Sequence, residues 1–161
     1  MNGTTDFAYP LDSYQKSYRL VPTKWRHVSV AVNRPHGHIW TFPEVDAFVG
    51  HVLLRSEPLV RVGAPRVEAN RLVARLDEFE PLALKEKSLC YTTNTGPWHK
   101  RTWFKAPATL NGRNLGAELP LTRPLVAYLA VKDINGRHVS SEHVEFSSEG
   151  VANRFNTAAS H

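Results

Sequence analysis

The feature that most constrains the fold of this sequence is a change in its apolar pattern near residue 57. Before that point, runs with helical spacing alternate with a short strand-like run. After it, short β-rich runs follow one another between turn residues. The 161-residue chain is therefore expected to have two parts, residues 1–57 and residues 58–148. Residues 149–161 are small and polar, which predicts a flexible tail.

Residues 1–57 are predicted to form helix, strand, loop and helix in that order. Leu11, Tyr14 and Tyr18 recur at helical spacing between two prolines, which predicts the first helix. The run "HVSVAV", residues 27–32, alternates valine with other residues, as in a strand covered on both faces. A second helix is expected to start at Thr41, because Thr41 and Glu44 have the spacing of a capping box.

Residues 58–148 are predicted to form a small all-β domain of the sandwich type. Their apolar runs are short and rich in β-branched and aromatic residues. The dipeptides Asn111-Gly112 and Asn135-Gly136 separate pairs of such runs and are typical of tight hairpin turns.

The first part of the chain resembles the end of an α/β-hydrolase domain. "NGTTDFAYPLDSYQKSY" is similar to the acid loop and the following helix of that family, and "RPHGH" with "PEVDAF" is similar to its histidine loop and terminal helix. The resemblance is to the branch of acetyl xylan esterases, dienelactone hydrolases and prolyl-oligopeptidase-like enzymes, including the PhoPQ-activated pathogenicity-related proteins. It implies an α/β fold class: residues 1–57 as the C-terminal piece of an α/β-hydrolase domain, followed by the sandwich-like domain.

The resemblance also implies the catalytic residues of a serine hydrolase. Asp6 takes the place of the triad acid, and the base is His38 or His36. His38 follows a glycine, as the base of such hydrolases usually does, and is favoured for that reason, with His36 kept as the alternative.

The serine nucleophile of such a triad is missing from this sequence. It belongs to a G-x-S-x-G turn that precedes the acid, and none of the ten serines lies in such a motif. The chain is therefore expected to be a fragment of an esterase or peptidase that is inactive alone. The ester or peptide substrate would bind to the full-length parent. A strand "HVSVAV" without parallel neighbours would expose a sheet edge through which the chain could form a homo-oligomer.

A second hypothesis is a noncatalytic binding module in which residues 58–148 are the working domain. Tyr91, Trp98 and Trp103 are candidates for carbohydrate contact, although a sandwich of this size also needs large residues in its core.

Several other classes are disfavoured by composition. The net charge of +5 is spread along the chain and no nucleic-acid-binding motif accompanies it. No cofactor is expected, and no metal, because Cys90 is the only cysteine and the His36/His38 pair has no third ligand nearby. No run is long enough to span a membrane, and the first residues are too polar for a signal peptide. The compartment stays open, since a longer parent could be exported.

Overall fold

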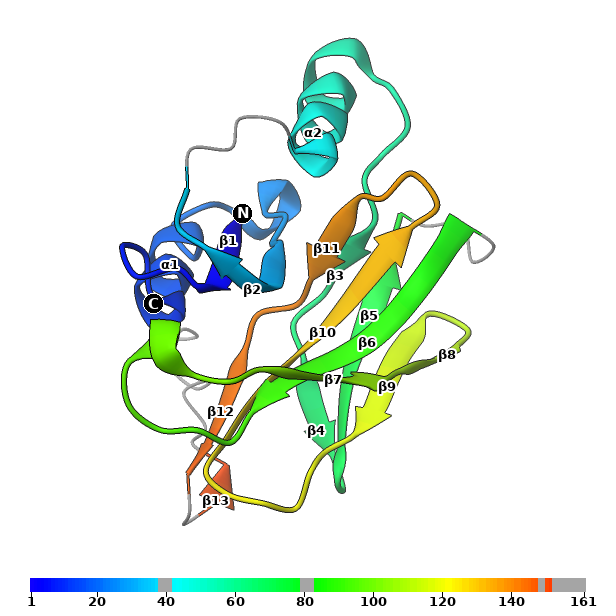
Figure 1. Ribbon diagram of the computed structural model, residues 1–161. Coiled ribbons are helices and arrows are strands. Elements are labelled where there is room, and N and C mark those ends of the chain that lie inside the picture. Colours follow the sequence, from blue (N-terminus) through cyan, green and yellow to red (C-terminus); the bar gives the residue numbers. More distant parts are fainter. Residues whose placement is uncertain (38–41, 79–82, 148–149, 152–161) are drawn as a thin grey trace, which may run out of the picture.

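The computed structural model describes residues 1–37, 42–78, 83–147 and 150–151. Figure 1 shows a two-sheet sandwich with the N-terminal elements on one side of it. The elements before the sandwich are β1 (Asn2–Thr5), α1 (Leu11–Tyr18), a 3-10 turn (Thr23–Trp25), β2 (Val30–Pro35) and α2 (Pro43–Leu54). The sandwich strands are β3 (Arg61–Val62), β4 (Arg66–Glu68), β5 (Arg71–Asp77), β6 (Leu84–Thr92), β7 (Phe104–Pro107), β8 (Thr109–Asn111), β9 (Asn114–Glu118), β10 (Leu125–Asp133), β11 (His138–Ser140), β12 (Val144–Ser147) and β13 (Gly150–Val151), with a 3-10 turn at Trp98–Lys100 before β7.

The sandwich consists of two antiparallel sheets. One has the order β13-β12-β10-β6-β7, with β11 also paired to β10. The other has the order β3-β5-β9-β8, with β4 paired to β5. Both predicted hairpin turns are confirmed, since Asn111-Gly112 joins β8 to β9 and Asn135-Gly136 joins β10 to β11. Gly112 and Gly136 have positive φ angles of 56° and 81°, the conformation for which glycine is favoured in such turns.

Strand β10 holds the layers together because both of its faces are buried. Alternate residues of a strand point to opposite faces. Leu125, Ala127, Leu129 and Val131 belong to the core between the two sheets. Val126, Tyr128 and Ala130 belong instead to a second core with residues of α1 and β2, among them Leu11 and Val30. The uninterrupted apolar run "LVAYLAV" thus reflects a strand with a sheet on one side and the N-terminal elements on the other.

The predicted α/β fold class is wrong. The structure is 42% strand and contains three sheets, and the N-terminal part supplies only a two-stranded one, in which β1 and β2 are parallel. Two parallel strands cannot form the multistranded sheet that an α/β domain buries between helices. The N-terminal elements instead bury their apolar side chains against the outer face of β6 and β10, as the second core shows.

Strand "HVSVAV" is not left without neighbours. Only its last three residues, 30–32, belong to β2, which continues to Pro35, so the observed strand begins three residues later than predicted. Strand β2 pairs with β1 on one side. On its other side the Ser140 backbone N–H donates to the Val28 carbonyl, and the Val30 N–H donates to the Ser140 hydroxyl. The edge expected to be open is therefore partly covered by β11, and self-association through it stays a prediction.

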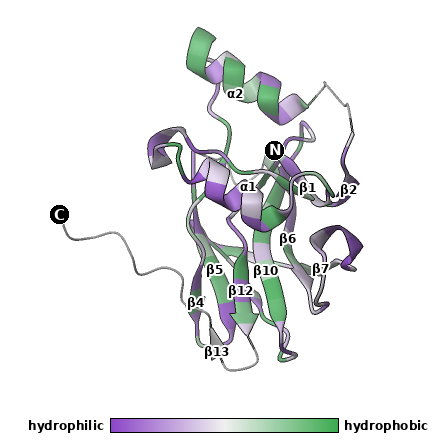
Figure 2. Ribbon diagram, turned by 90° about the vertical axis from the view of Figure 1, so that its left-hand side faces the viewer, coloured by the Kyte–Doolittle hydropathy of each residue, from purple (hydrophilic) through white to green (hydrophobic). Residues whose placement is uncertain are grey.

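The second helix begins at Pro43, and its N-cap residue, Phe42, makes no side-chain capping bond. Thr41, at which the helix was expected to start, lies outside the described residues, as do residues 149 and 152–161 of the expected flexible tail. Residues 150 and 151 form β13. The outward side of α2 carries Val45, Val49 and Leu53, which are between 44% and 72% exposed. Figure 2 shows that much of α2 consists of hydrophobic residues.

Three polar side chains connect the N-terminal elements to the sandwich. The Ser29 hydroxyl oxygen lies 3.4 Å from Glu44 Oε1 of α2 and 3.3 Å from His138 Nδ1 of β11. Ser29 and Glu44 are both buried. Burial lowers the pKa of His138 to about 4, and the positive charge of Lys105 acts in the same direction. His138 is therefore neutral in the folded protein at neutral pH.

This depressed pKa predicts a loss of stability in mild acid. Between pH 6.5 and pH 4 the unfolded chain binds a proton at His138 and the folded chain does not, so stability falls as the pH drops through this window. We expect the free energy of unfolding to decrease by about 2 kcal/mol between pH 7 and pH 5. Urea unfolding at both pH values measures the change.

The matched variants are His138→Gln and the same change at the exposed His99. The His138 variant should show the smaller pH dependence, with a remainder from His27, whose pKa burial also lowers. The His99 variant should behave like the original chain. An equally steep dependence in the His138 variant would contradict the prediction.

Candidate functional site

Asp6 and His36 meet at one end of the β1–β2 pair. Asp6 directly follows β1, and His36 directly follows β2. Because the two strands are parallel, their carboxyl ends lie at the same edge, and the residues after them become neighbours. Asp6 Oδ2 and His36 Nδ1 are 3.2 Å apart. The pairing of a carboxylate with Nδ1 is the geometry that orients a catalytic histidine.

The Asp6 carboxylate is held by its own loop. Its second oxygen, Oδ1, accepts hydrogen bonds from the backbone N–H groups of Ala8, at 2.8 Å, and Tyr9, at 3.0 Å. The Asn2 side-chain amide donates to the Tyr9 carbonyl at 2.7 Å, which ties this turn to β1. Asp6 is only 8% exposed. A short acidic side chain that bonds the backbone two and three residues on is typical of turns, so here the turn itself presents Oδ2 to His36.

The His36 ring is enclosed by two aromatic residues of the same loop. The Phe7 ring packs edge-on at a centroid distance of 5.3 Å, and the Tyr9 ring lies at 5.6 Å. Phe7 and Tyr9 are themselves largely exposed, at 66% and 62%. With Nδ1 donating its proton to Asp6, Nε2 is the basic nitrogen of the neutral ring. The loop therefore supplies the acid, the orientation of the base and an aromatic rim.

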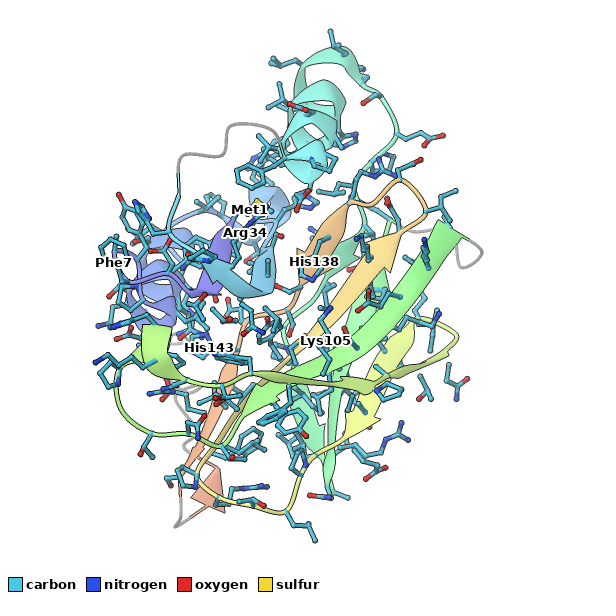
Figure 3. The ribbon with its side chains drawn as sticks, viewed as in Figure 1. Met1, Phe7, Arg34, Lys105, His138 and His143 are labelled. Carbon is cyan, nitrogen blue, oxygen red and sulfur yellow. The ribbon has the colours of Figure 1, made fainter. Side chains whose placement is uncertain are left out.

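A cavity of about 460 Å³ lies beside this pair. This volume is within the range of sites that bind small organic molecules. Its lining includes Asp6, His36, Arg34, Tyr14 and Phe42. The cavity therefore lies between the loop of the acid, the end of β2, helix α1 and the start of α2. Figure 3 shows the side chains of this region, with Arg34 beside Met1 near β2.

Of the two histidines proposed as the base, His36 is among the described residues and contacts Asp6. The favoured candidate, His38, lies outside the described residues, so its position does not enter the comparison. His36 was ranked second because it does not follow a glycine. Its position directly after β2, at the same level as Asp6 after β1, is a property of the strand pairing that local sequence does not show.

Two serines line the same cavity, both from α1. These are Ser13 and Ser17, and the Ser17 hydroxyl donates to the Ser13 carbonyl at 3.2 Å. Neither lies in a G-x-S-x-G motif or on a turn between a strand and a helix. They belong to the wall of the cavity and lack the exposed turn geometry of a hydrolase nucleophile.

The three aromatic residues considered for carbohydrate contact do not form one exposed platform. Trp103 is 4% exposed and packs against Tyr128 in the second core, so it is not available to a sugar at the surface. The centre of the Trp98 ring lies 3.7 Å from the guanidinium carbon of Arg101 and 5.4 Å from the centre of the His143 ring. Tyr91 packs against Phe104 at 5.6 Å. The expectation that one of these residues belongs to the core is confirmed by Trp103.

Arg34 is the residue of this site that sequence reasoning missed. Its signal in the sequence is its position at the start of "RPHGH", two residues before His36. Among the described residues, no group of three histidine, cysteine or acidic side chains is arranged to hold a metal ion. Within the same residues, the helices are too short or too polar to cross a bilayer.

Comparisons with known proteins identify no family. Neither a protein-family model nor a curated protein matches the chain. Two crystal structures of OgpA from Akkermansia muciniphila are similar to part of it, each with 15% identity over 60% of this chain, with TM-scores of 0.36 and 0.35. The chain spans 30% and 29% of the length of the OgpA chains. A likeness of this extent identifies neither a fold nor a function.

Proposed function

We propose that this chain carries the acid and base of a serine hydrolase that acts on ester or peptide bonds. The observation that supports it is the 3.2 Å contact between Asp6 Oδ2 and His36 Nδ1 at the ends of two parallel strands, beside a cavity of substrate size. In this role His36 Nε2 takes the proton of the attacking hydroxyl and later gives it to the leaving group. Asp6 keeps the ring in the required tautomer and stabilises the imidazolium.

The nucleophile of this hydrolase would come from a polypeptide segment outside this sequence. The sequence has no G-x-S-x-G motif, and Ser13 and Ser17 are in a helix rather than on a nucleophile turn. We therefore expect the chain alone to hydrolyse a short-chain activated ester no faster than buffer. Activity that disappears in both Asp6→Ala and His36→Ala would show that a nucleophile within the chain completes the site, and would contradict this part of the proposal.

The orientation of the base can be measured directly. In the ¹⁵N-labelled chain at a pH where His36 is neutral, we expect its proton on Nδ1, because the carboxylate of Asp6 accepts from that nitrogen. Long-range ¹H–¹⁵N correlation spectra of the imidazole distinguish the two tautomers. In Asp6→Ala the proton should move, at least in part, to Nε2. A neutral His36 that carries its proton on Nε2 in the original chain would contradict the proposed role of Asp6.

A further inference from the structure

Arg34 shares the cavity of the proposed acid–base pair. It is at the end of β2, two residues before His36, and both side chains line the cavity of about 460 Å³. An arginine side chain here places a fixed positive charge within the space that a substrate of His36 would occupy, because the guanidinium stays protonated at every physiological pH.

The contacts of the Arg34 guanidinium do not neutralise its charge. Its carbon lies 4.6 Å from the centre of the Phe42 ring, and Nη1 lies 3.8 Å from the Met1 sulfur. In the described part of the chain, no carboxylate forms an ion pair with it, whereas Arg19 and Arg137 each pair with one. The acid of this cavity, Asp6, is occupied by His36 and two backbone N–H groups.

The Phe42 ring lies near the guanidinium carbon of Arg34. The N–H groups of an arginine form a planar fork whose spacing matches the two oxygens of a carboxylate. Among the described residues, the Met1 sulfur, a weak acceptor, is the hydrogen-bond partner of this guanidinium. The guanidinium therefore has N–H donors available to a carboxylate of a bound molecule.

We propose that Arg34 binds a carboxylate on the substrate, so that the site selects esters whose acyl or alcohol part also carries a free carboxylate. This inference rests on the proposed function, since it assigns the substrate class of the same cavity. Arg34 acts as a specificity residue: it contacts the charged end of the substrate, while His36 serves the bond that is cleaved. A neutral ester of the same size lacks the group that would pair with the guanidinium and binds more weakly.

The experiment compares two probes on the labelled full chain by NMR titration. Monomethyl succinate carries one ester and one carboxylate, and dimethyl succinate is its neutral counterpart. We expect monomethyl succinate to bind at least about tenfold more tightly and to shift the Arg34 Nε–H signal together with signals of His36. In Arg34→Gln the preference should disappear, and in Arg34→Lys it should be reduced, because the charge remains without the planar donors.

One further variant separates this inference from its alternatives. Arg66→Gln removes the same charge from the exposed strand β4 and should keep the preference. Equal affinity for the two probes, a preference that survives Arg34→Gln, or equally tight binding of inorganic phosphate would overturn the inference. If His36 lacks the Nδ1 proton while the preference depends on Arg34, the proposed hydrolase function fails and the anion site stands.

Discussion

Gly3→Ala is expected to destabilise the protein by about 3 kcal/mol or more and to separate Asp6 from His36. A Cβ atom on Gly3 would lie 1.9 Å from the Arg34 carbonyl oxygen and 2.7 Å from the carbonyl carbon of the same residue. Atoms of the main chain cannot move aside as the end of a flexible side chain can. Strand β1 must therefore shift relative to β2, and the two residues that follow these strands shift with it.

The matched control for this substitution is Gly37→Ala. Gly37 lines the same cavity and directly follows His36, but a Cβ atom there would have no neighbour within 4 Å among the described residues. Its substitution should change stability by no more than about 0.5 kcal/mol. Denaturant unfolding gives the stabilities, and the imidazole ¹⁵N spectrum shows whether the Nδ1 proton of His36 is retained. A Gly3→Ala protein with unchanged stability and tautomer would mean that β1 and β2 are not packed as closely as described.

Locally encoded features could be predicted from the sequence, and features that depend on distant pairing could not. Helix α1 follows from its apolar spacing, and the hairpins at Asn111-Gly112 and Asn135-Gly136 follow from their turn residues. Strand β1 has the sequence Asn-Gly-Thr-Thr, without one large apolar residue, and exists because β2 pairs with it. No periodicity in the residues themselves marks such a strand.

The segment "RHVSSEHVEF" shows a second limit of local pattern. Its alternation of polar residues predicts a strand with a solvated face, but it forms two short strands, β11 and β12. Ser140, the last residue of β11, and Ser141, which follows it, are both buried. The two hydroxyls accept hydrogen bonds from the backbone N–H groups of Val30 and Leu129. Polar side chains with such partners can be buried at little cost, and only the tertiary structure identifies the partners.

The α/β fold class expected from the sequence is wrong, whereas the structure does bring Asp6 and His36 together, and this difference has a physical reason. In the structure Asp6 is followed by α1, β2 and His36, in the order expected from the sequence, and the parallel pairing of β1 with β2 places Asp6 beside His36. The catalytic role of these residues stays a prediction. The same order does not specify what covers β2. Here it is covered from the sandwich through Tyr128, whose hydroxyl donates to the Val30 carbonyl at 3.0 Å. The contact between Asp6 and His36 depends on the pairing of β1 with β2, and the layers around that pair differ from the expected domain.

The largest functional effects are expected where a serine nucleophile completes the site. In a hydrolase in which a serine from outside this sequence completes the site, Asp6→Asn should lower kcat about 10⁴-fold, which corresponds to about 5 kcal/mol of transition-state stabilisation. The amide keeps the shape of the carboxylate but can present a donor to Nδ1, which favours the wrong tautomer. His36→Ala should lower kcat at least as much, because the proton acceptor is lost.

The pattern of these losses separates catalysis from structural support. Asp6→Asn and His36→Ala should lower kcat with little change in KM, because neither residue is expected to bind the ground-state substrate. Arg34→Gln should instead mainly raise KM for carboxylate-bearing esters. Asp46→Asn, at an exposed aspartate in the first turn of α2, should leave both constants unchanged. Steady-state ester hydrolysis by the four variants provides the comparison. If Asp6→Asn keeps the original kcat, the Asp6–His36 contact has only a structural role in linking two loops. In the wrong tautomer the accepting nitrogen is Nδ1, which faces residue 6 and not the substrate, so a catalytic His36 could not work at the full rate.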